Sequence, residues 1–242
     1  MLSASRKELI KELLLKLNVQ ADNLELFDEA LTHPSFNFEQ NLLDNKDYER
    51  LEFLGDSVLR LALSSILFDK YTNYDEGNLS KIRSFLVSDE FLSVIAKKLE
   101  LSKYLKIGKH EEKDGGRYKE SILACASEAV LGAIYITKGF VTAKICIKNI
   151  YEKMDIDIQN ILYSYNSKEI LQQYTQKINK DLPEYNIINE SGSEHNKIYE
   201  VNVVYRGEEL GKGKAGTKKE AEKKAAFAAI KKLNLIKGDS YE

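Results

Sequence analysis

The chain has 242 residues, of which 43% are hydrophobic and 31% charged, as is typical of a globular protein with one or two domains. A net charge of −2 does not mark the whole chain as nucleic-acid-binding, and two cysteines exclude a disulfide-built scaffold and favour a reducing compartment. No segment approaches the roughly 20 consecutive apolar residues that span a bilayer, so we expect a cytoplasmic protein without a membrane partner.

The N-terminal segments predict short helices. Residues 3–17 mix charged side chains with leucines and predict an amphipathic helix, unlike the apolar core of a secretory signal. Residues 24–32 predict a second helix that ends at His33-Pro34, because proline restricts the residue before it. We interpret His33 as a hydrogen-bonded structural residue rather than a metal ligand. Residues 37–47 are polar and predict a loop.

Residues 48–68 predict a long helix with an unusual charge pattern. Glu49, Glu52 and Asp56 share one narrow face at about 100° per residue. Beyond the first turn, the only other charged residue is Arg60, and apolar side chains surround nearly the whole helix. Buried carboxylates are costly unless they are paired, solvated or metal-bound. One arginine does not neutralise three acids, so we predict an oxygen-rich site for Mg²⁺ or Mn²⁺ rather than a solvated acidic stripe.

A second apolar helix is predicted over residues 122–137, and it holds one charged residue, Glu128. A paired or half-exposed glutamate is one explanation of this pattern. We favour the other, in which Glu128 faces Glu52 and Asp56 and completes one pocket. A shared pocket then accounts for the unpaired acids of both buried helices.

Between these two helices the sequence predicts two more, over residues 79–87 and 90–99, with Ser88 and Asp89 as the cap between them. Residues 108–120 are highly charged and predict a loop that faces the solvent.

The C-terminal part predicts elements in the order α-β-β-β-α. Ser167 is expected to cap a first helix, and Lys212–Lys224 holds six Lys against two Glu, a basic patch suited to phosphates. Residues 155–166 close the first domain or form a short linker, which gives domain limits of 1–160 and 166–236. The expected elements are a helix over 167–177, strands over 183–188, 199–205 and 208–212, and a helix over 217–233.

Four segments carry a resemblance to a known family. Glu-Arg-Leu-Glu-Phe-Leu-Gly-Asp-Ser-Val-Leu at 49–59 closely resembles the signature of ribonuclease III, the double-strand-specific endoribonuclease. Leu-Thr-His-Pro-Ser-Phe at 31–36 and Glu-Gly-x-Leu-Ser at 76–80 match two further elements. The Gly-x-Gly…Thr-Lys-Lys run at 211–219 resembles the double-stranded RNA-binding domain. The resemblance implies an all-α endonuclease domain followed by a small α+β RNA-binding domain.

The resemblance also implies an activity: metal-assisted hydrolysis of double-stranded RNA in ribosomal RNA maturation and mRNA processing. The products would carry 5′-phosphate and 3′-hydroxyl ends with short 3′ overhangs, and the staggered cut implies a homodimer. Mg²⁺ would be the cofactor, with Mn²⁺ able to substitute. The implied residues are Asp56 and Glu128 for catalysis; Glu52, Asp56 and Glu128 for the metal; Glu49 and Glu76 in support; Gln172, His195, Lys218, Lys219 and Lys223 for RNA; and Phe53 for insertion into the partner subunit.

Cys125 departs from the family pattern, because it stands where the family usually has Asp, three residues before Glu128. A thiol is a soft ligand that suits Mg²⁺ poorly, so we expect Cys125 not to coordinate the ion. Three consequences are open: activity with Glu52, Asp56 and Glu128 helped by Glu49, a higher metal requirement, or RNA binding with little cutting. We favour retained activity.

Two rival classes follow from the same residues. One is a protein, such as a ribosome-associated scaffold, that binds double-stranded RNA without cleaving it. Its support is Cys125, whereas the retained acids argue against it. The other is an unrelated metal-dependent phosphohydrolase with a helical carboxylate site, which a chain with three histidines supports poorly.

Overall fold

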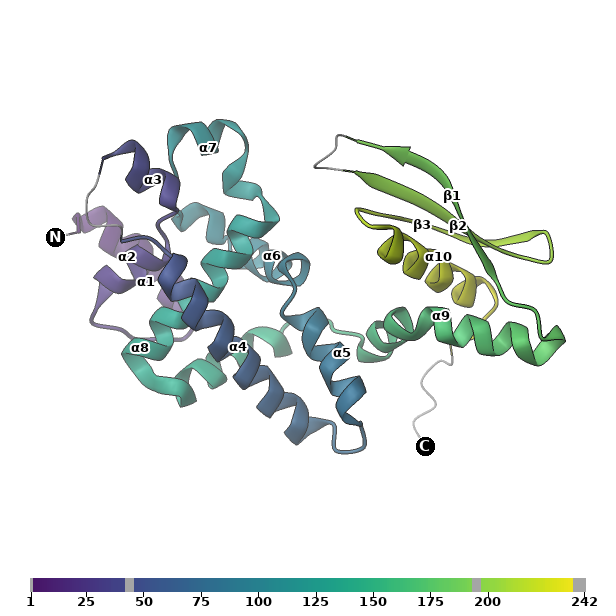
Figure 1. Cartoon of the computed structure of the whole chain (residues 1–242). Helices are drawn as coiled ribbons and strands as arrows, with labels where there is room; N and C mark the ends of the chain where they lie inside the picture. Colours follow the sequence, from purple (N-terminus) through teal and green to yellow (C-terminus); the bar gives the residue numbers. More distant parts are fainter. Residues whose placement is uncertain (1, 42–45, 193–196, 237–242) are drawn as a thin grey trace. The chain divides into compact units, whose positions relative to one another are not determined.

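The structure, a computed structural model, describes residues 2–41, 46–192 and 197–236, and the chain divides into two compact units between Ile156 and Asp157. The first unit is helical, and the second contains a sheet with two helices (Figure 1). This confirms the predicted fold class. The elements of the first unit are α1 (Ala4–Lys16), α2 (Leu24–Ala30), α3 (Pro34–Glu39), α4 (Glu49–Lys70), α5 (Glu76–Leu86), α6 (Asp89–Lys98), η1 (Leu101–Tyr104), α7 (Lys109–Lys113), η2 (Gly116–Tyr118) and α8 (Glu120–Glu152).

Helices α4 and α8 form the centre of the first unit. Their buried apolar side chains fill the core, among them Leu59, Leu63, Leu123 and Ile134, each at most 1% exposed. Contacts of Tyr48, the residue before α4, fix where this helix starts. The Tyr48 backbone N–H donates to Thr32 O at 3.0 Å, and the Tyr48 ring lies edge-on to His33. The two predicted apolar helices are therefore long neighbours in the core.

Two glycines allow the backbones of α4 and α8 to touch. A Cβ atom at Gly55 would overlap the carbonyl oxygen of Glu128, and one at Gly132 would overlap the carbonyl oxygen of Leu51. Any larger residue would push the helices apart at this level. The close approach occurs beside Asp56 and Glu128, so it sets the distance between the acids of the two helices.

Helix α8 is, in the described part of the chain, the one helix whose length and composition would allow it to cross a membrane. It bends at Gly139, where φ is 76°, and its first half packs into the core against α4 and α6. Its apolar character is thus that of a core helix.

The predicted loops are more ordered than expected. Residues 108–120 contain α7 and η2, and Glu39 accepts hydrogen bonds from the backbone N–H groups of Lys109 and His110 at 2.6 and 2.8 Å. The sequence missed this cap because Glu39 is remote along the chain. The predicted loop at 37–47 partly belongs to α3, and residues 42–45 of it lie outside the described part.

The second unit comprises α9 (Ile158–Asn179), β1 (Glu184–Ser191), β2 (Ile198–Tyr205), β3 (Glu208–Ala215) and α10 (Lys218–Lys232). Its sheet is antiparallel in the order β1-β2-β3, and α9 and α10 cover one face of it (Figure 1). Leu171, Val201, Val203 and Ile230 join the two helices to the sheet in one core. Gly213 lets α10 lie directly on β3, because a Cβ there would overlap the carbonyl oxygen of Ala221.

Helix α9 begins earlier than the helix predicted over residues 167–177. Ser167 does not cap a helix but lies inside α9, where it is buried and donates a hydrogen bond to Lys223 O at 3.0 Å. The cap is Asp157, whose side chain accepts from the Asn160 backbone N–H. Residues 158–166, predicted as a domain end or linker, are helical, and the earlier limits of 1–160 and 166–236 divide this helix.

Candidate active site

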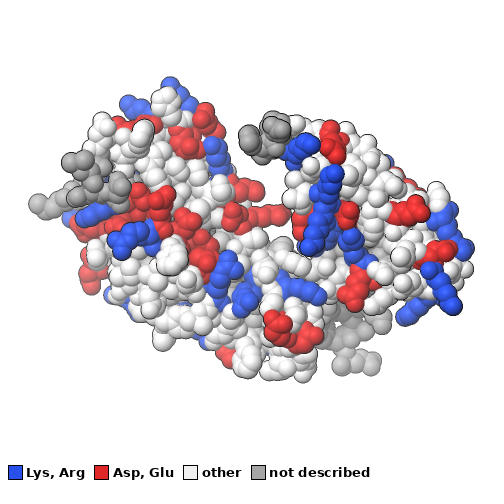
Figure 2. Space-filling model, in the orientation of Figure 1, with Lys and Arg blue, Asp and Glu red and all other residues white. Residues whose placement is uncertain are grey.

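The acids predicted from the two apolar helices come together where α4 meets α8. Glu52 and Asp56 lie one turn apart on α4, and Glu128 projects from α8 beside the Gly55 contact. The side chains of Asp56 and Glu128 lie within hydrogen-bonding reach of each other. Acidic side chains gather on this side of the first unit, over the N-terminal half of α4 (Figure 2).

Glu128 is the most perturbed acid of the group. Burial raises its pKa to about 8, and the negative charges of Asp56, Glu52 and Asp89 and the hydrogen bond with Asp56 add to the shift. A carboxyl group that resists ionisation among other acids gains strongly from a cation that replaces the proton. The sequence-based pairing of Glu128 with Glu52 and Asp56 thus has a physical basis in the structure.

Cys125 faces the same site, as its spacing from Glu128 implied. Its thiol shares a hydrogen bond with the Glu52 carboxylate. Burial, together with Glu52 and Glu128, raises the pKa of the thiol to about 12, so it remains neutral at physiological pH. Burial raises the pKa of Glu52, the thiol hydrogen bond opposes this, and Glu49 is the first of the neighbouring acids that add to it. Cys125 therefore gives the site a hydrogen-bond donor but no negative charge.

Asp89 is a fourth acid at the site, which the sequence did not reveal. It is the first residue of α6, and its negative charge raises the pKa of Glu52, Cys125 and Glu128. From sequence it was interpreted only as part of a cap, and the Ser88 side chain is the group that caps α6. No periodic pattern could have found Asp89, because α6 packs against α8 from elsewhere in the chain.

Asp56 is held by Arg60, one turn further along α4. Arg60 Nε donates to both carboxylate oxygens of Asp56, at 2.7 and 2.8 Å. Among the described residues, no group of three or more His, Cys, Asp or Glu side chains is arranged to hold a metal ion. The donors nevertheless fit a hard divalent cation, since Glu52, Asp56 and Glu128 offer carboxylate oxygens that repel one another.

The remaining acids are more peripheral. Glu49 is exposed at the start of α4, where its charge raises the pKa of Glu52. Glu76 is exposed at the start of α5 and accepts a hydrogen bond from Ser80 Oγ at 2.8 Å. This hydrogen bond lies within α5 and does not join Glu76 to the other acids. His33 has the structural role predicted for it: Nδ1 accepts from the Ser35 backbone N–H and caps α3.

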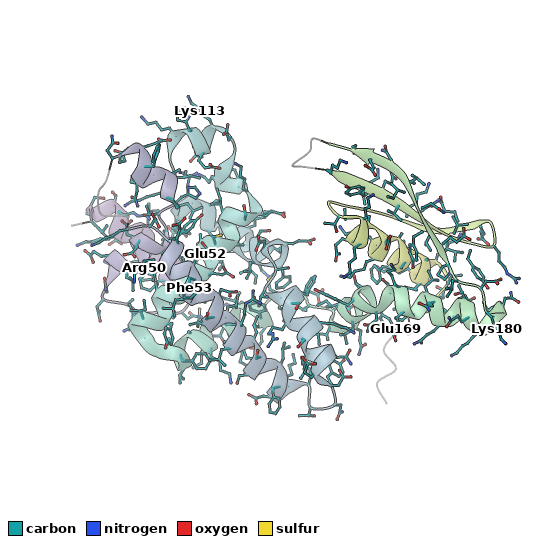
Figure 3. All side chains as sticks on the ribbon, in the orientation of Figure 1. Arg50, Glu52, Phe53, Lys113, Glu169 and Lys180 are labelled. Carbon is teal, nitrogen blue, oxygen red and sulfur yellow. The ribbon has the colours of Figure 1, made fainter. Side chains whose placement is uncertain are left out.

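Phe53 lies beside Glu52 near the start of α4 (Figure 3) but is 79% exposed. Other apolar side chains of α4 and α8 are exposed with it, and both helices therefore present apolar surface to the solvent. They are Leu61, Phe68, Tyr135, Ile136, Val141 and Ile145.

In the second unit, lysines gather at the N-terminal end of α10 (Figure 2). Thr217 caps this helix by accepting from the Glu220 backbone N–H at 3.2 Å. Lys218 and Lys219 are exposed, whereas Lys223 lies over the Tyr165 ring at 3.8 Å. Gln172 is exposed on α9, and His195 lies outside the described residues. The helix N-terminus and the exposed lysines form a site suited to phosphate.

Comparison with known proteins agrees with this geometry. A family model described as Ribonuclease-III-like matches residues 23–154, and one described as Double-stranded RNA binding motif matches residues 167–233. The curated protein Ribonuclease 3 of Staphylococcus aureus (strain JH9) is 39% identical over 225 residues, which cover 92% of this chain and 91% of that protein.

Two solved structures of the nuclease domain of ribonuclease III from Campylobacter jejuni are also similar. One is 39% identical with a TM-score of 0.56 and covers 60% of this chain and 96% of that chain. The other is 37% identical with a TM-score of 0.55 and covers 61% of this chain and 97% of that chain. With its carboxylates at the α4–α8 contact and its α-β-β-β-α unit, the chain belongs to the ribonuclease III family of double-strand-specific endoribonucleases.

Proposed function

We propose that this chain hydrolyses phosphodiester bonds of double-stranded RNA with a divalent cation held by Glu52, Asp56 and Glu128. The observation that carries the proposal is the position of Asp56 and Glu128, two acids from different helices that lie within hydrogen-bonding reach of each other at the glycine contact of α4 and α8. Mg²⁺, or Mn²⁺ in its place, suits these hard oxygen donors. When bound, the cation supplies charge stabilisation and an activated water for an in-line displacement.

The protein's own residues have distinct tasks in this reaction. Asp56 and Glu128 would be the catalytic ligands that hold the cation. Glu52 completes the donor set, and the Cys125 thiol restrains it by hydrogen bonding. Glu49 and Asp89 add negative charge around the site. The products would be 5′-phosphate and 3′-hydroxyl ends with short 3′ overhangs, in processing of ribosomal RNA and mRNA.

A staggered cut needs two sites, so we propose a homodimer. The exposed apolar surface of α4 and α8, with Phe53 at 79% exposure, supports this arrangement. One of the Campylobacter jejuni structures is described in terms of a region involved in dimer formation of its nuclease domain. Phe53 would then bury its ring against the partner subunit.

The second unit would hold the duplex. Lys218 and Lys219 at the capped start of α10 would contact phosphates, and Gln172 and His195 would reach the minor groove. Recognition of this kind reads the shape of the duplex and depends weakly on sequence. The free thiols of Cys125 and Cys146 fit a reducing, cytoplasmic setting, and no membrane partner is proposed.

A second candidate function is duplex binding without turnover. The specific observation in its favour is the neutral thiol of Cys125, which leaves the site with one charge fewer than the family pattern. We favour cleavage because Glu52, Asp56 and Glu128 remain together.

The deciding experiment is cleavage of a long perfect RNA duplex during titration with Mg²⁺ and with Mn²⁺. We expect metal-dependent cutting, and we expect Glu128→Gln to lower its rate by on the order of a hundredfold or more. Glu90→Gln, which changes an exposed acid of α6, is the matched control and should cut normally. Tight duplex binding without cutting at any metal concentration would leave a binding protein.

A further inference from the structure

Arg60 occupies the carboxylate that the proposed reaction needs most. Its Nε atom lies 2.7 Å from Oδ1 and 2.8 Å from Oδ2 of Asp56, so both oxygens of this acid accept from one guanidinium. The same Asp56 lies beside Glu128 of α8. In the absence of metal, the protein's own cation therefore lies against the centre of the carboxylate group.

The charge of Arg60 also acts on an acid other than Asp56, its hydrogen-bond partner. The guanidinium is hydrogen-bonded to Asp56 and is also within electrostatic reach of Glu128, so both catalytic acids attract it. Cys125 adds no charge that would offset it. A divalent cation entering this group of acids meets a fixed positive charge a few ångströms away, which weakens its binding.

Arg60 opposes the cation without blocking it. The side chains of Arg60 and Asp56 are 52% and 32% exposed, so the guanidinium has room to turn into the solvent. Exposed ion pairs are weak, and little is lost when such a contact opens. A cation can therefore displace the Arg60 guanidinium from Asp56. The free energy lost in opening this ion pair raises the metal concentration at which the site fills.

We propose that Arg60 is a positioning residue that holds Asp56 in the metal-free enzyme and sets the concentration of divalent cation at which the site fills. This inference rests on the proposed metal-assisted function of Glu52, Asp56 and Glu128. Arg60 acts through Asp56 and contacts neither the cation nor the RNA. The simpler alternative is an i,i+4 ion pair that only stabilises α4, which would leave metal affinity unchanged.

The test measures Mn²⁺ binding to the full chain by electron paramagnetic resonance, without RNA, after removal of metal with a chelator. We expect Arg60→Gln to lower the Kd for Mn²⁺ about three- to tenfold, with Arg60→Lys in between. Lys70→Gln is the matched control, since it removes the same charge from α4 about 15 Å further along the helix. It should change the Kd by less than about twofold.

A second readout is the metal concentration for half-maximal cleavage, which should fall in Arg60→Gln by a similar factor. The inference is overturned if Arg60→Gln binds Mn²⁺ with unchanged or lower affinity than wild type. It is also overturned if the variant raises KM for the duplex at constant Mn²⁺ affinity, which would make Arg60 an RNA contact.

Failure of the proposed function has a different signature. If Glu128→Gln binds Mn²⁺ as tightly as wild type, the metal site is not the one assigned to these acids, and both proposals fall. If Glu128→Gln loses the ion but Arg60→Gln gains nothing, the proposed metal site stands and the role of Arg60 alone is refuted.

Discussion

Burial and the charges of Asp56, Glu52 and Asp89 raise the pKa of Glu128 to about 8 in the metal-free protein, from its ordinary value of 4.5. Between these two values the native state binds more protons than the unfolded chain, so the free energy of unfolding falls as pH rises. We expect Glu128→Gln to lose much of this pH dependence and to be more stable than wild type at about pH 8. Urea unfolding in EDTA from about pH 5 to 8 measures it. An unchanged pH slope in Glu128→Gln would contradict the assignment, and Glu90→Gln should retain the wild-type slope.

Asp89 should contribute to metal binding through its charge. Asp89→Asn removes a negative charge that acts on Glu52, Cys125 and Glu128, so we expect the pKa of Glu128 to fall and the Kd for Mn²⁺ to rise about three- to tenfold. Glu90→Gln at the next position is the control. Equal Mn²⁺ affinities of Asp89→Asn and Glu90→Gln would remove Asp89 from the site.

At the scale of single residues, the sequence predicted those acids that stand out within their own helix. Glu52, Asp56 and Glu128 are isolated charges in apolar helices, and burial makes such charges expensive. Asp89 was not predicted as a site residue, because the helix dipole alone already favours an acid at the start of a helix. The hydrogen bond of Cys125 with Glu52 depends on side-chain rotamers that no spacing rule supplies.

At the scale of helices, the contact of α4 with α8 depends on Gly55. Gly55→Ala places a methyl group against the Glu128 carbonyl oxygen, so we expect a loss of about 2–4 kcal/mol in the free energy of unfolding. Gly77→Ala is the matched control, because the nearest atom to its Cβ would be Asp75 Oδ1 at 3.6 Å. It should change stability by about 1 kcal/mol or less. Urea unfolding of both variants tests this, and a stable Gly55→Ala would refute the close contact.

Most elements could be predicted because their periodicity is strong, as in α4, α8 and β2. The predicted boundaries of helices were wrong where contacts with residues distant in the sequence determine them. Ser167 resembles an N-cap in sequence, yet its hydroxyl bonds to Lys223 O from a helix 56 residues away, so α9 runs through this position. Likewise Glu39 orders α7 from 70 residues upstream. Local patterns do not contain such contacts.

At the scale of the whole molecule, the exposed apolar surface of α4 and α8 predicts an effect on assembly. Phe53→Glu introduces a charge where Phe53 is 79% exposed, and we expect it to weaken the proposed homodimer about tenfold or more. Leu15→Glu alters an apolar residue of α1 that is 77% exposed and should leave the dimer intact. Sedimentation equilibrium of both variants measures the association, and an unchanged dimer in Phe53→Glu would exclude Phe53 from the interface.

The glycine contact between α4 and α8 has a consequence for how this protein tolerates change. At Gly55 and Gly132 every other amino acid adds a Cβ, so no substitution avoids a clash with the facing carbonyl. In a saturation screen scored by RNA cleavage, we expect both positions to be as intolerant as Asp56 and Glu128. A screen scored by protein abundance would separate them, since loss of the glycines should reduce folded protein while loss of the acids should not.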